Sequence, residues 1–596
     1  MVKKFIKKYF ESFAYFYSYL RYRILILFII SLLIGVLDGF GLTMFLPLLQ
    51  MVNKSSEVDP ASLGNLRFVV DFFNNMGISM TLLSVLLIMA IFFFVKGIIT
   101  YVGSIYNVNV REDFISRLRV RNIKGLNNLA YKYFVMSDIG RIQNTLSGEV
   151  DRVAAAYSNY FKAFQDGVLV IVYMGFAFTM DAQFALLVTV GGVLTNFLYK
   201  SLYKNTKGVS RTLTGHNNIF QSLIIQNVGN YKYLKATGSL HRYGAKLEES
   251  VLKIKESNTK IGKLDSLLIA GREPILIFVV VAVIFIQTSI LGSELGPILI
   301  SLLFFYRALN YLMQMQVKWN KFLAVSGSLE NMTSFQKELR KNKEKKGSNI
   351  LDSRIEEIKL SNVSFYYNQT KILKDISLNI KQNETVAFVG ESGSGKTTLV
   401  NVIAGLLPPE SGKLLANGKN YDDLNMGGLQ KKIGYITQDP VIFNDTIFNN
   451  ISFWSEKNPD NTEKFWKAVN QAAILDFVNE LPEKENTILG NNGVNLSGGQ
   501  RQRISIAREL FKEIEILILD EATSALDSET EKAIQGNIEL LKGEYTILIV
   551  AHRISTIKNA DRIVVMKNGE VSNVANFSSL MIESKYFKKL VELQEI

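Results

Sequence analysis

Up to about residue 316, the chain carries six apolar runs, each near or above the roughly 20 residues that a helix needs to cross the hydrocarbon core of a bilayer. Inside lipid, every backbone polar group must find its partner within the protein, which leaves helices and closed barrels as the only spanning structures. Uninterrupted runs of this length favour helices. They cover residues 24–52, 80–106, 157–180, 182–201, 269–291 and 295–316. The sequence therefore predicts an integral membrane protein whose first domain is all-α, with six long transmembrane helices.

Basic residues beside these runs predict which side faces the cytoplasm. They precede the first run and are frequent in the two long connections that follow the second and fourth runs. Cytoplasmic loops carry an excess of Lys and Arg, so both connections are placed there. This pattern explains the net charge of +13, and we exclude a nucleic-acid partner. The absence of cysteine excludes disulfides and thiolate metal sites, and the first apolar run is too long for a cleavable signal peptide.

The composition changes after about residue 353, where the apolar runs stop and a soluble pattern begins. We predict four regions: an N-terminal cytoplasmic amphipathic helix (1–22), the transmembrane domain with two long cytoplasmic loops (23–330), a charged linker (331–352) and an α/β domain (353–596). Between the first two runs, Leu66, Val69, Val70 and Phe73 share one helical face. They predict a short amphipathic helix that lies either on the outer membrane surface or on protein.

The soluble region carries a phosphate-binding loop in its expected setting. Residues 384–389 form a buried-strand pattern, the run 390–397 (GESGSGKT) follows at once, and a helical pattern continues to residue 406. Glycines let backbone N–H groups converge on phosphates, and the helix N-terminus adds its positive dipole end. We expect Lys396 to reach the β- and γ-phosphates of ATP and the Thr397 hydroxyl to ligate Mg²⁺. The predicted nucleotide-binding residues here are Gly390, Gly393, Ser394, Gly395, Lys396, Thr397 and Thr398.

Two further apolar strands end in residues suited to the same chemistry. The strand 514–519 is followed by Asp520 and Glu521. We expect Asp520 to hold Mg²⁺, directly or through water, and Glu521 to act as general base on the attacking water. The strand 546–550 leads to His552, which we interpret as a sensor of the γ-phosphate.

Between these elements lies the run 496–500 (LSGGQ), whose Ser497, Gly498, Gly499 and Gln500 predict a second anion-binding helix N-terminus. This run after a phosphate loop resembles the signature of the ABC ATPases, and the likeness covers the whole region from about residue 355 to residue 596. The resemblance implies an α/β P-loop ABC ATPase domain. It also implies that two such domains bind face to face, so that each ATP lies between the phosphate loop of one copy and the signature of the other.

The same resemblance assigns three more residues. Tyr367 falls where the family places an aromatic ring that stacks on adenine, and Gln438 matches the loop that contacts Mg²⁺ and water. Asp527 matches the loop that links the two nucleotide sites. Since no chemistry-bearing position is degenerate, a homodimer is favoured. One departure concerns residues 487–493, where exporters of this type often carry a Glu and an Arg and this chain has Asn491 and Asn492.

The first half of the chain is similar to the membrane domain of ABC exporters. Tyr133 and Phe134, with residues 140–144, look like the first coupling segment of that family, and residues 226–238 look like the second. The resemblance implies alternating access driven by ATP, in a bacterial inner membrane with the ATPase domain in the cytoplasm.

Three basic residues within or beside the spans are the candidate substrate contacts: Lys96, Arg272 and Arg307. Ionisable groups at this depth face protein or a water-filled cavity, and arginine binds phosphate with two hydrogen bonds. A structural role is also open, because Lys96 can pair with Asp38 and Arg272 with Glu273.

The preferred substrate is a lipid-linked oligosaccharide or another pyrophosphate lipid, since these features resemble the ABC flippases of that class. A multidrug or lipid A-type exporter is the alternative. A nucleotide-gated channel or regulator of the same fold is disfavoured by the presence of Glu521.

Overall fold

The computed structural model describes residues 2–45, 47–48, 72–73, 75–77, 79, 81–180, 182–290, 295–345, 347–521, 536, 539–551 and 557–592. Two compact units divide the chain. The helical unit contains Met1–Leu129 and Met136–Lys343, and the α/β unit contains Ala130–Val135 and Glu344–Ile596. The α/β unit therefore includes a short segment from the first cytoplasmic loop of the helical half.

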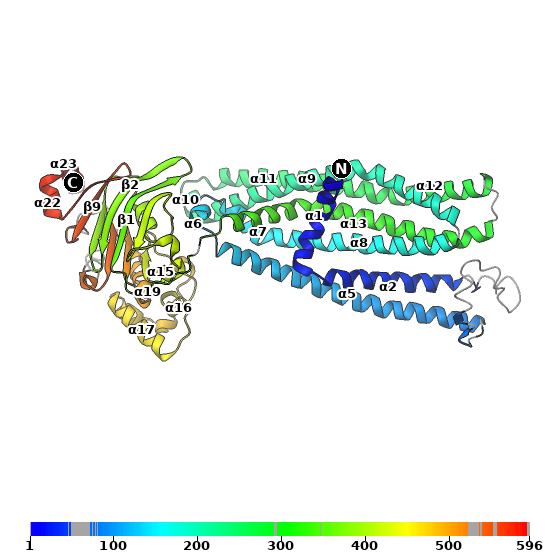
Figure 1. Ribbon diagram of the computed structural model, residues 1–596, viewed down its shortest axis with the longest axis horizontal. Helices are drawn as coiled ribbons and strands as arrows, with labels where there is room; N and C mark the ends of the chain where they lie inside the picture. The colour runs from blue at the N-terminus through cyan, green and yellow to red at the C-terminus, as the bar shows by residue number, and fades with distance from the viewer. Residues whose placement is uncertain are drawn as a thin grey trace. The chain divides into compact units, whose positions relative to one another are not determined.

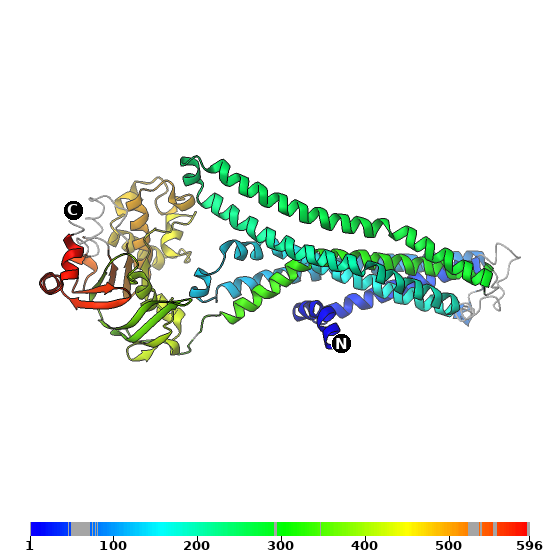
Figure 2. The ribbon, with the colours of Figure 1, turned by 90° about the horizontal axis from the view of Figure 1, so that it is seen from above.

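Long helices make up the helical unit (Figure 1). They are α1 (Val2–Leu20), α2 (Arg23–Thr43), α5 (Leu82–Leu126), α7 (Ile139–Leu146), α8 (Gly148–Met180), α9 (Ala182–Gly229), α10 (Tyr231–Ala236), α11 (Leu240–Ala270), α12 (Arg272–Phe285), the π-helical turn Ile286–Ile290 and α13 (Leu295–Lys341). Along their lengths α8 packs on α13, α2 on α5, and α11 on α9 (Figures 1 and 2).

The described parts of the six predicted spans lie mainly in these helices, but α2 ends at Thr43, before the predicted end of the first span, and the fifth span crosses from α11 into α12 and the π-helical turn. Among the described residues, four helices are long and apolar enough to cross a membrane: Arg23–Thr43, Leu82–Leu126, Gly148–Thr179 and the continuous stretch Leu240–Phe285. The fourth and sixth predicted spans are the first parts of α9 and α13. Helix α13 runs on to Lys341, well into the region predicted as a charged linker. The predicted outer amphipathic helix lies almost wholly outside the described residues.

An aromatic core joins the N-terminal helix to the spanning helices. Phe16 of α1 is fully buried, and its ring lies 5.6 Å from the ring of Phe114 on α5 and 5.8 Å from that of Tyr157 on α8. Such edge-to-face contacts stabilise beyond the area that they bury. The predicted amphipathic helix thus buries its apolar face against protein at its C-terminal end.

A buried carboxylate joins the first three spans. Asp38 of α2 is 1% exposed and accepts hydrogen bonds from Lys96 Nζ of α5 and from the Tyr173 hydroxyl of α8. The Tyr173 ring stacks on Tyr311 of α13 with centroids 5.4 Å apart. An ionised group inside a membrane is stable only when it is paired, and Lys96 supplies that pair.

Two sheets form the frame of the α/β unit. The four-stranded antiparallel sheet has the order β2-β1-β4-β5, and the six-stranded sheet has the order β10-β9-β3-β8-β7-β6. The strands are β1 (Glu357–Tyr367), β2 (Thr370–Lys381), β3 (Thr385–Val389), β4 (Ser411–Ala416), β5 (Lys419–Asn420), β6 (Ile433–Ile436), β7 (Ile516–Asp520), β8 (Thr546–Val550), β9 (Arg562–Lys567) and β10 (Glu570–Ala575). In the six-stranded sheet only β10 runs antiparallel to its neighbour.

Helices complete the α/β unit. They are α6 (Tyr131–Val135), α14 (Lys396–Ile403), α15 (Met426–Lys431), α16 (Ile447–Ser452), α17 (Pro459–Gln471), α18 (Leu475–Glu480), α19 (Gly498–Phe511), α22 (Phe577–Glu583) and α23 (Lys585–Glu592), with 3-10 turns at Tyr421–Asp423, Lys484–Asn486 and Asn491–Gly493. One hydrophobic core joins α14 and the antiparallel sheet, and a second joins α16, α17 and α19. Strand β3 contributes to both and is buried at every residue, as the sequence pattern predicts for a central parallel strand.

Candidate nucleotide site

The phosphate-binding loop follows the central strand of the six-stranded sheet. Strand β3 pairs in parallel with β8 and β9, and the loop 390–395 leads directly into α14. Gly390 and Gly395 have φ angles of 153° and 99°, a conformation that favours glycine. A Cβ at Gly390 would lie 2.3 Å from the carbonyl oxygen of Met566, so no side chain fits there. The backbone is therefore wrapped tightly at the start of a helix.

Two side chains of this loop fit an anion. Ser394 is 4% exposed, and its Oγ has no hydrogen-bond partner within the described part of the chain. A buried hydroxyl without a partner costs free energy, which a phosphate oxygen would recover. Lys396 is 5% exposed, and its Nζ donates to the carbonyls of Gly390 (2.9 Å) and Glu391 (3.2 Å), so the ammonium group is held beside the loop. Burial lowers the pKa of Lys396.

The predicted metal ligands lie next to each other. The Thr397 hydroxyl donates to Asp520 Oδ1 at 3.2 Å, which joins the start of α14 to the end of β7. Burial raises the pKa of Asp520, while hydrogen bonds from Tyr435 and Thr397 oppose that shift. A hydroxyl beside a carboxylate is a fitting donor set for Mg²⁺, which usually takes one or two protein oxygens and completes its shell with phosphate and water. Accordingly, the described residues hold no cluster of three or more His, Cys, Asp or Glu that would bind a metal alone.

Glu521 has a strained backbone. Its φ is 52°, which is unusual for a residue other than glycine, and its N–H donates to Val550 O of β8 at 3.0 Å. Strain of this kind persists only where the surrounding structure enforces it, and it is common at active sites. The carboxylate lies close enough to Lys396 and Asp520 to influence both of their pKa values.

The signature run begins α19. Ser497 is its N-cap: the Ser497 Oγ accepts from the N–H of Gln500 at 3.2 Å, and Gln500 Oε1 accepts from the N–H of Ser497 at 2.8 Å. This capping box fixes the helix start while leaving Ser497 exposed. Among the described residues, no hydrogen bond connects the signature run, with Gly498 and Gly499, to the phosphate loop of the same chain. Farther along α19, buried Arg508 donates to the carbonyls of Asn450 (2.6 Å) and Val441 (2.8 Å).

The remaining predicted residues of the site are dispersed. Tyr367 ends β1, with its ring 4.9 Å from that of Phe365, and Gln438 is exposed in the loop after β6. Thr398 lies in the first turn of α14. Asp527 and His552 lie outside the described residues.

Helix α6, which contains the predicted coupling residues Tyr133 and Phe134, packs within the α/β unit. Lys132 forms an ion pair with Glu410 and lies over the Phe365 ring at 5.0 Å. Chain connectivity then leads through residues 136–138 to α7 of the helical unit. The second predicted segment corresponds to α10, which is mostly exposed within the helical unit.

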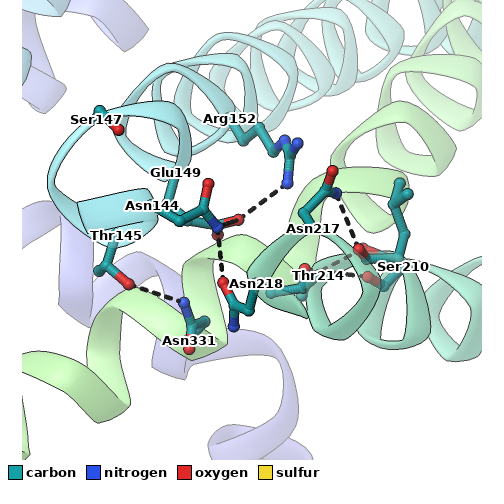
Figure 3. A network of polar contacts seen from close by, with 12 residues as sticks. Asn144, Thr145, Ser147, Glu149, Arg152, Ser210, Thr214, Asn217, Asn218 and Asn331 are labelled. Carbon is teal, nitrogen blue, oxygen red and sulfur yellow. Dashed lines mark hydrogen bonds and ion pairs between the residues drawn. The ribbon is translucent and has the colours of Figure 1, made fainter. Parts of the chain in front are cut away.

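A polar network, which we call the α7 clamp, fixes α7 against α8, α9 and α13 (Figure 3). Asn144 Nδ2 donates to Asn218 Oδ1 at 2.6 Å and to Glu149 Oε1 at 3.3 Å. Gly140 makes the close approach possible, because a Cβ there would lie 2.4 Å from Ser222 Cα. The other members are Thr145 with Asn331 (3.3 Å), Arg141 with Glu338 (2.8 Å) and Glu149 with Arg152 (2.9 Å).

The three candidate substrate residues lie in different settings. Lys96 is paired with Asp38, so the structure favours its structural role. Arg307 is half-buried in α13, one turn before Tyr311 and within hydrogen-bonding reach of its hydroxyl. Arg272 begins α12 and is also half-buried.

The sequence motifs did not identify every residue that shapes the site. The Tyr435 hydroxyl contacts both Asp520 and Asn401, and Arg508 anchors α19. No role was predicted for Tyr435, although it lies near Gln438 in the sequence. The sequence signal for Tyr435 was its place in a buried-strand pattern that ends close to Gln438, a predicted metal ligand.

Family models match both halves of the chain. Residues 24–317 match the model described as ABC transporter transmembrane region, and residues 373–524 match the model described as ABC transporter. The chain is 31% identical over 508 residues to the ATP-dependent lipid A-core flippase of Psychrobacter arcticus, which covers 83% of each chain. It is 30% identical over 514 residues to the protein of the same name from Hahella chejuensis, over 84% of this chain and 86% of that one.

A shorter match reaches a higher identity. The ATP-dependent lipid A-core flippase of Syntrophus aciditrophicus is 44% identical over 239 residues, which is 40% of this chain and 39% of that one. Among solved structures, a bacterial Atm1-family ABC exporter with ATP bound superposes with a TM-score of 0.79 at 20% identity and covers 97% of this chain and 100% of that chain. This confirms the predicted fold class of a helical exporter membrane domain followed by an α/β ATPase domain.

Proposed function

This chain belongs to the ABC transporter family, with an exporter-type membrane domain joined to an ATPase domain, and we propose that it spends ATP to flip a phosphorylated lipid of the lipid A type across the membrane. It is an integral membrane protein and an ATPase whose hydrolysis drives export. The substrate and the roles of individual residues are the proposed parts.

The chemistry that we assign to the nucleotide site rests on the sequence motifs and is supported by the geometry of the phosphate loop. The loop amides, Ser394 and Lys396 bind and orient the β- and γ-phosphates, with Tyr367 against the adenine. Thr397, Asp520 and Gln438 would hold Mg²⁺, which would neutralise charge on the phosphates. Glu521 accepts the proton of the attacking water, and His552 contacts the γ-phosphate. The observation that carries this assignment is the 3.2 Å contact between Thr397 and Asp520, because it brings two distant motifs to one point.

A second copy of the chain completes the site. The signature residues 497–500 make no hydrogen bond to the phosphate loop of their own chain among the described residues, and Ser497 is exposed at the start of a capped helix. We assign them, with Asp527, to the nucleotide held by a partner. A homodimer is the simplest assembly, because one chain supplies one membrane domain and one ATPase domain.

The full-length relatives favour a lipid A-type substrate over the lipid-linked oligosaccharide that the sequence alone favoured. Two of them share about 30% identity with this chain over more than four-fifths of its length, and both are named lipid A-core flippases. Both lipid classes carry phosphate groups, so Arg307 and Arg272 remain the candidate contacts for the head group. Lys96 is removed from this set because its charge is already balanced by Asp38.

Reconstitution tests this proposal directly. The purified protein in proteoliposomes is supplied with ATP and with a lipid A-type glycolipid, a polyprenyl-pyrophosphate oligosaccharide or a neutral glycolipid. We expect ATP-dependent flipping of the first, stimulated ATPase activity with the same lipid, and neither effect in Lys396→Ala. Flipping of the pyrophosphate lipid alone would return the function to the oligosaccharide class.

A further inference from the structure

A tyrosine that no motif assigns lies against the predicted metal ligand. Tyr435 is in β6, which pairs in parallel with β7, and its hydroxyl lies 3.0 Å from Asp520 Oδ2. The same hydroxyl lies 3.0 Å from the side-chain amide of Asn401, on α14. The phenol therefore joins β6, β7 and the helix that follows the phosphate loop.

The direction of these hydrogen bonds follows from the groups involved. The phenol of Tyr435 is the donor, because a tyrosine hydroxyl is protonated at neutral pH. A phenol has one proton to donate, and the carboxylate is an acceptor only. The Asn401 atom at this distance is Oδ1, which is also an acceptor, so the phenol proton lies between two acceptors, of which the charged Asp520 carboxylate is the stronger.

Both oxygens of Asp520 are then held. Oδ1 accepts from Thr397 at 3.2 Å, and Oδ2 accepts from Tyr435 at 3.0 Å. A carboxylate fixed at Oδ2 by a ring in a buried strand cannot rotate freely about its last bond. Its Oδ1 consequently stays beside the Thr397 hydroxyl, where the two oxygens form the donor pair for a metal.

We propose that Tyr435 is a positioning residue for the metal site, whose hydroxyl fixes the Asp520 carboxylate so that Oδ1 is presented to Mg²⁺ beside Thr397. This inference rests on the proposed role of Asp520 as a metal ligand. Hydrogen-bonded partners behind a ligand orient it, and their removal typically lowers metal affinity about 10–100-fold.

The position of Tyr435 also links the metal site to α6. Tyr131, the first residue of α6, lies close enough to influence the pKa values of both Tyr435 and Tyr367. Tyr435 therefore lies near α6, and the chain continues from α6 into α7.

Metal binding by the full-length protein in detergent tests the inference without relying on turnover. Mn²⁺ replaces Mg²⁺, and its affinity in the presence of ADP is measured by EPR; ADP affinity is also measured by calorimetry with Mg²⁺ and with EDTA. For Tyr435→Phe we expect Mn²⁺ affinity to fall about tenfold or more and ADP affinity in EDTA to stay at the wild-type value. The matched control is Tyr421→Phe, which also deletes a buried phenol hydroxyl, one that donates to Ile403 O at 3.1 Å.

Each outcome separates the inference from its premise. If Asp520→Asn lowers Mn²⁺ affinity and Tyr435→Phe does not, the positioning role is wrong and the metal role of Asp520 stands. If Asp520→Asn also binds Mn²⁺ as the wild type does, the premise fails and the inference with it. An equal loss of ADP affinity with and without metal in Tyr435→Phe would contradict the inference too, because the hydroxyl would then support the phosphate loop.

Discussion

Replacing Asn144 by alanine should uncouple ATP hydrolysis from transport. Asn144 is the centre of the α7 clamp, and α7 is separated by only residues 136–138 from α6, which packs within the α/β unit. The substitution removes the amide that joins α7 to Glu149 of α8 and to Asn218 of α9. It leaves every residue of the nucleotide site unchanged, so we expect the rate of ATP hydrolysis to stay near that of the wild type.

The size of the effect can be worked from the contacts. Asn144 is 6% exposed, and one of its two hydrogen bonds goes to the fully buried carboxylate of Glu149. A hydrogen bond to a charged group contributes about 1.5–3 kcal/mol and one between neutral groups about 0.5–1.5 kcal/mol. The clamp therefore loses roughly 2–4 kcal/mol, which matches or exceeds the 1–3 kcal/mol that typically couples distant sites.

The assay compares the rate of lipid flipping with the rate of ATP hydrolysis in the same proteoliposomes. We expect flipping per ATP to fall at least severalfold in Asn144→Ala while hydrolysis stays near the wild-type rate. Gln143→Ala is the matched control, because Gln143 is the adjacent residue and is exposed. A normal ratio in Asn144→Ala would refute the reasoning, and so would a parallel loss of both rates in a protein that melts at the wild-type temperature.

Four further substitutions test other parts of the structure. Glu521→Gln should bind ATP normally and hydrolyse it about 10²–10⁴-fold more slowly, since a general base contributes that much; rapid turnover measured by phosphate release would rule out the assigned base. Lys96→Met should lower the melting temperature, because it leaves buried Asp38 without its ion-pair partner at a cost of about 3–5 kcal/mol. Arg307→Ala should keep the wild-type melting temperature and lose lipid-stimulated ATPase activity. The opposite result would make Arg307 the structural residue and Lys96 the substrate contact. Burial raises the pKa of Glu149, so the native state holds that proton more tightly than the unfolded state and loses stability as pH rises through the raised pKa. The melting temperature of the wild type, relative to Glu149→Gln, should therefore fall with rising pH, and a flat difference would show that the carboxyl does not titrate in the folded protein.

Features encoded in continuous stretches were predictable from the sequence. The long helices of the membrane domain follow from the length of apolar runs, and the phosphate loop follows from glycines at fixed spacing between a strand and a helix. The structure has β3, the loop and α14 in that order. Thr397 and Asp520, which are far apart in sequence, lie in contact, as two ligands of one metal ion should, and their role as ligands stays a prediction.

Contacts that depend on how elements pack were not predictable in the same way. Tyr435 meets Asp520 because β6 and β7 are neighbours in a particular register, which no local pattern encodes. The hydrogen bond between Asn144 and Asn218 depends on how α7 packs against α9, which the sequence does not specify locally. The sequence left two roles open for Lys96, a substrate contact or an ion pair with Asp38. The ion pair is favoured only once α2 and α5 are seen to lie side by side.

The pairing of Asp38 with Lys96 has a consequence for biosynthesis. A lone Asp or Lys at the centre of a helix costs about 2.5–3.5 kcal/mol when the translocon passes that helix into lipid. Helix α2 emerges from the ribosome with its Asp unmatched, and α5 brings the compensating ammonium only after the outer loop has been made. The two helices are thus expected to enter the bilayer together as a hairpin, with the ion pair forming before either is released to the lipid.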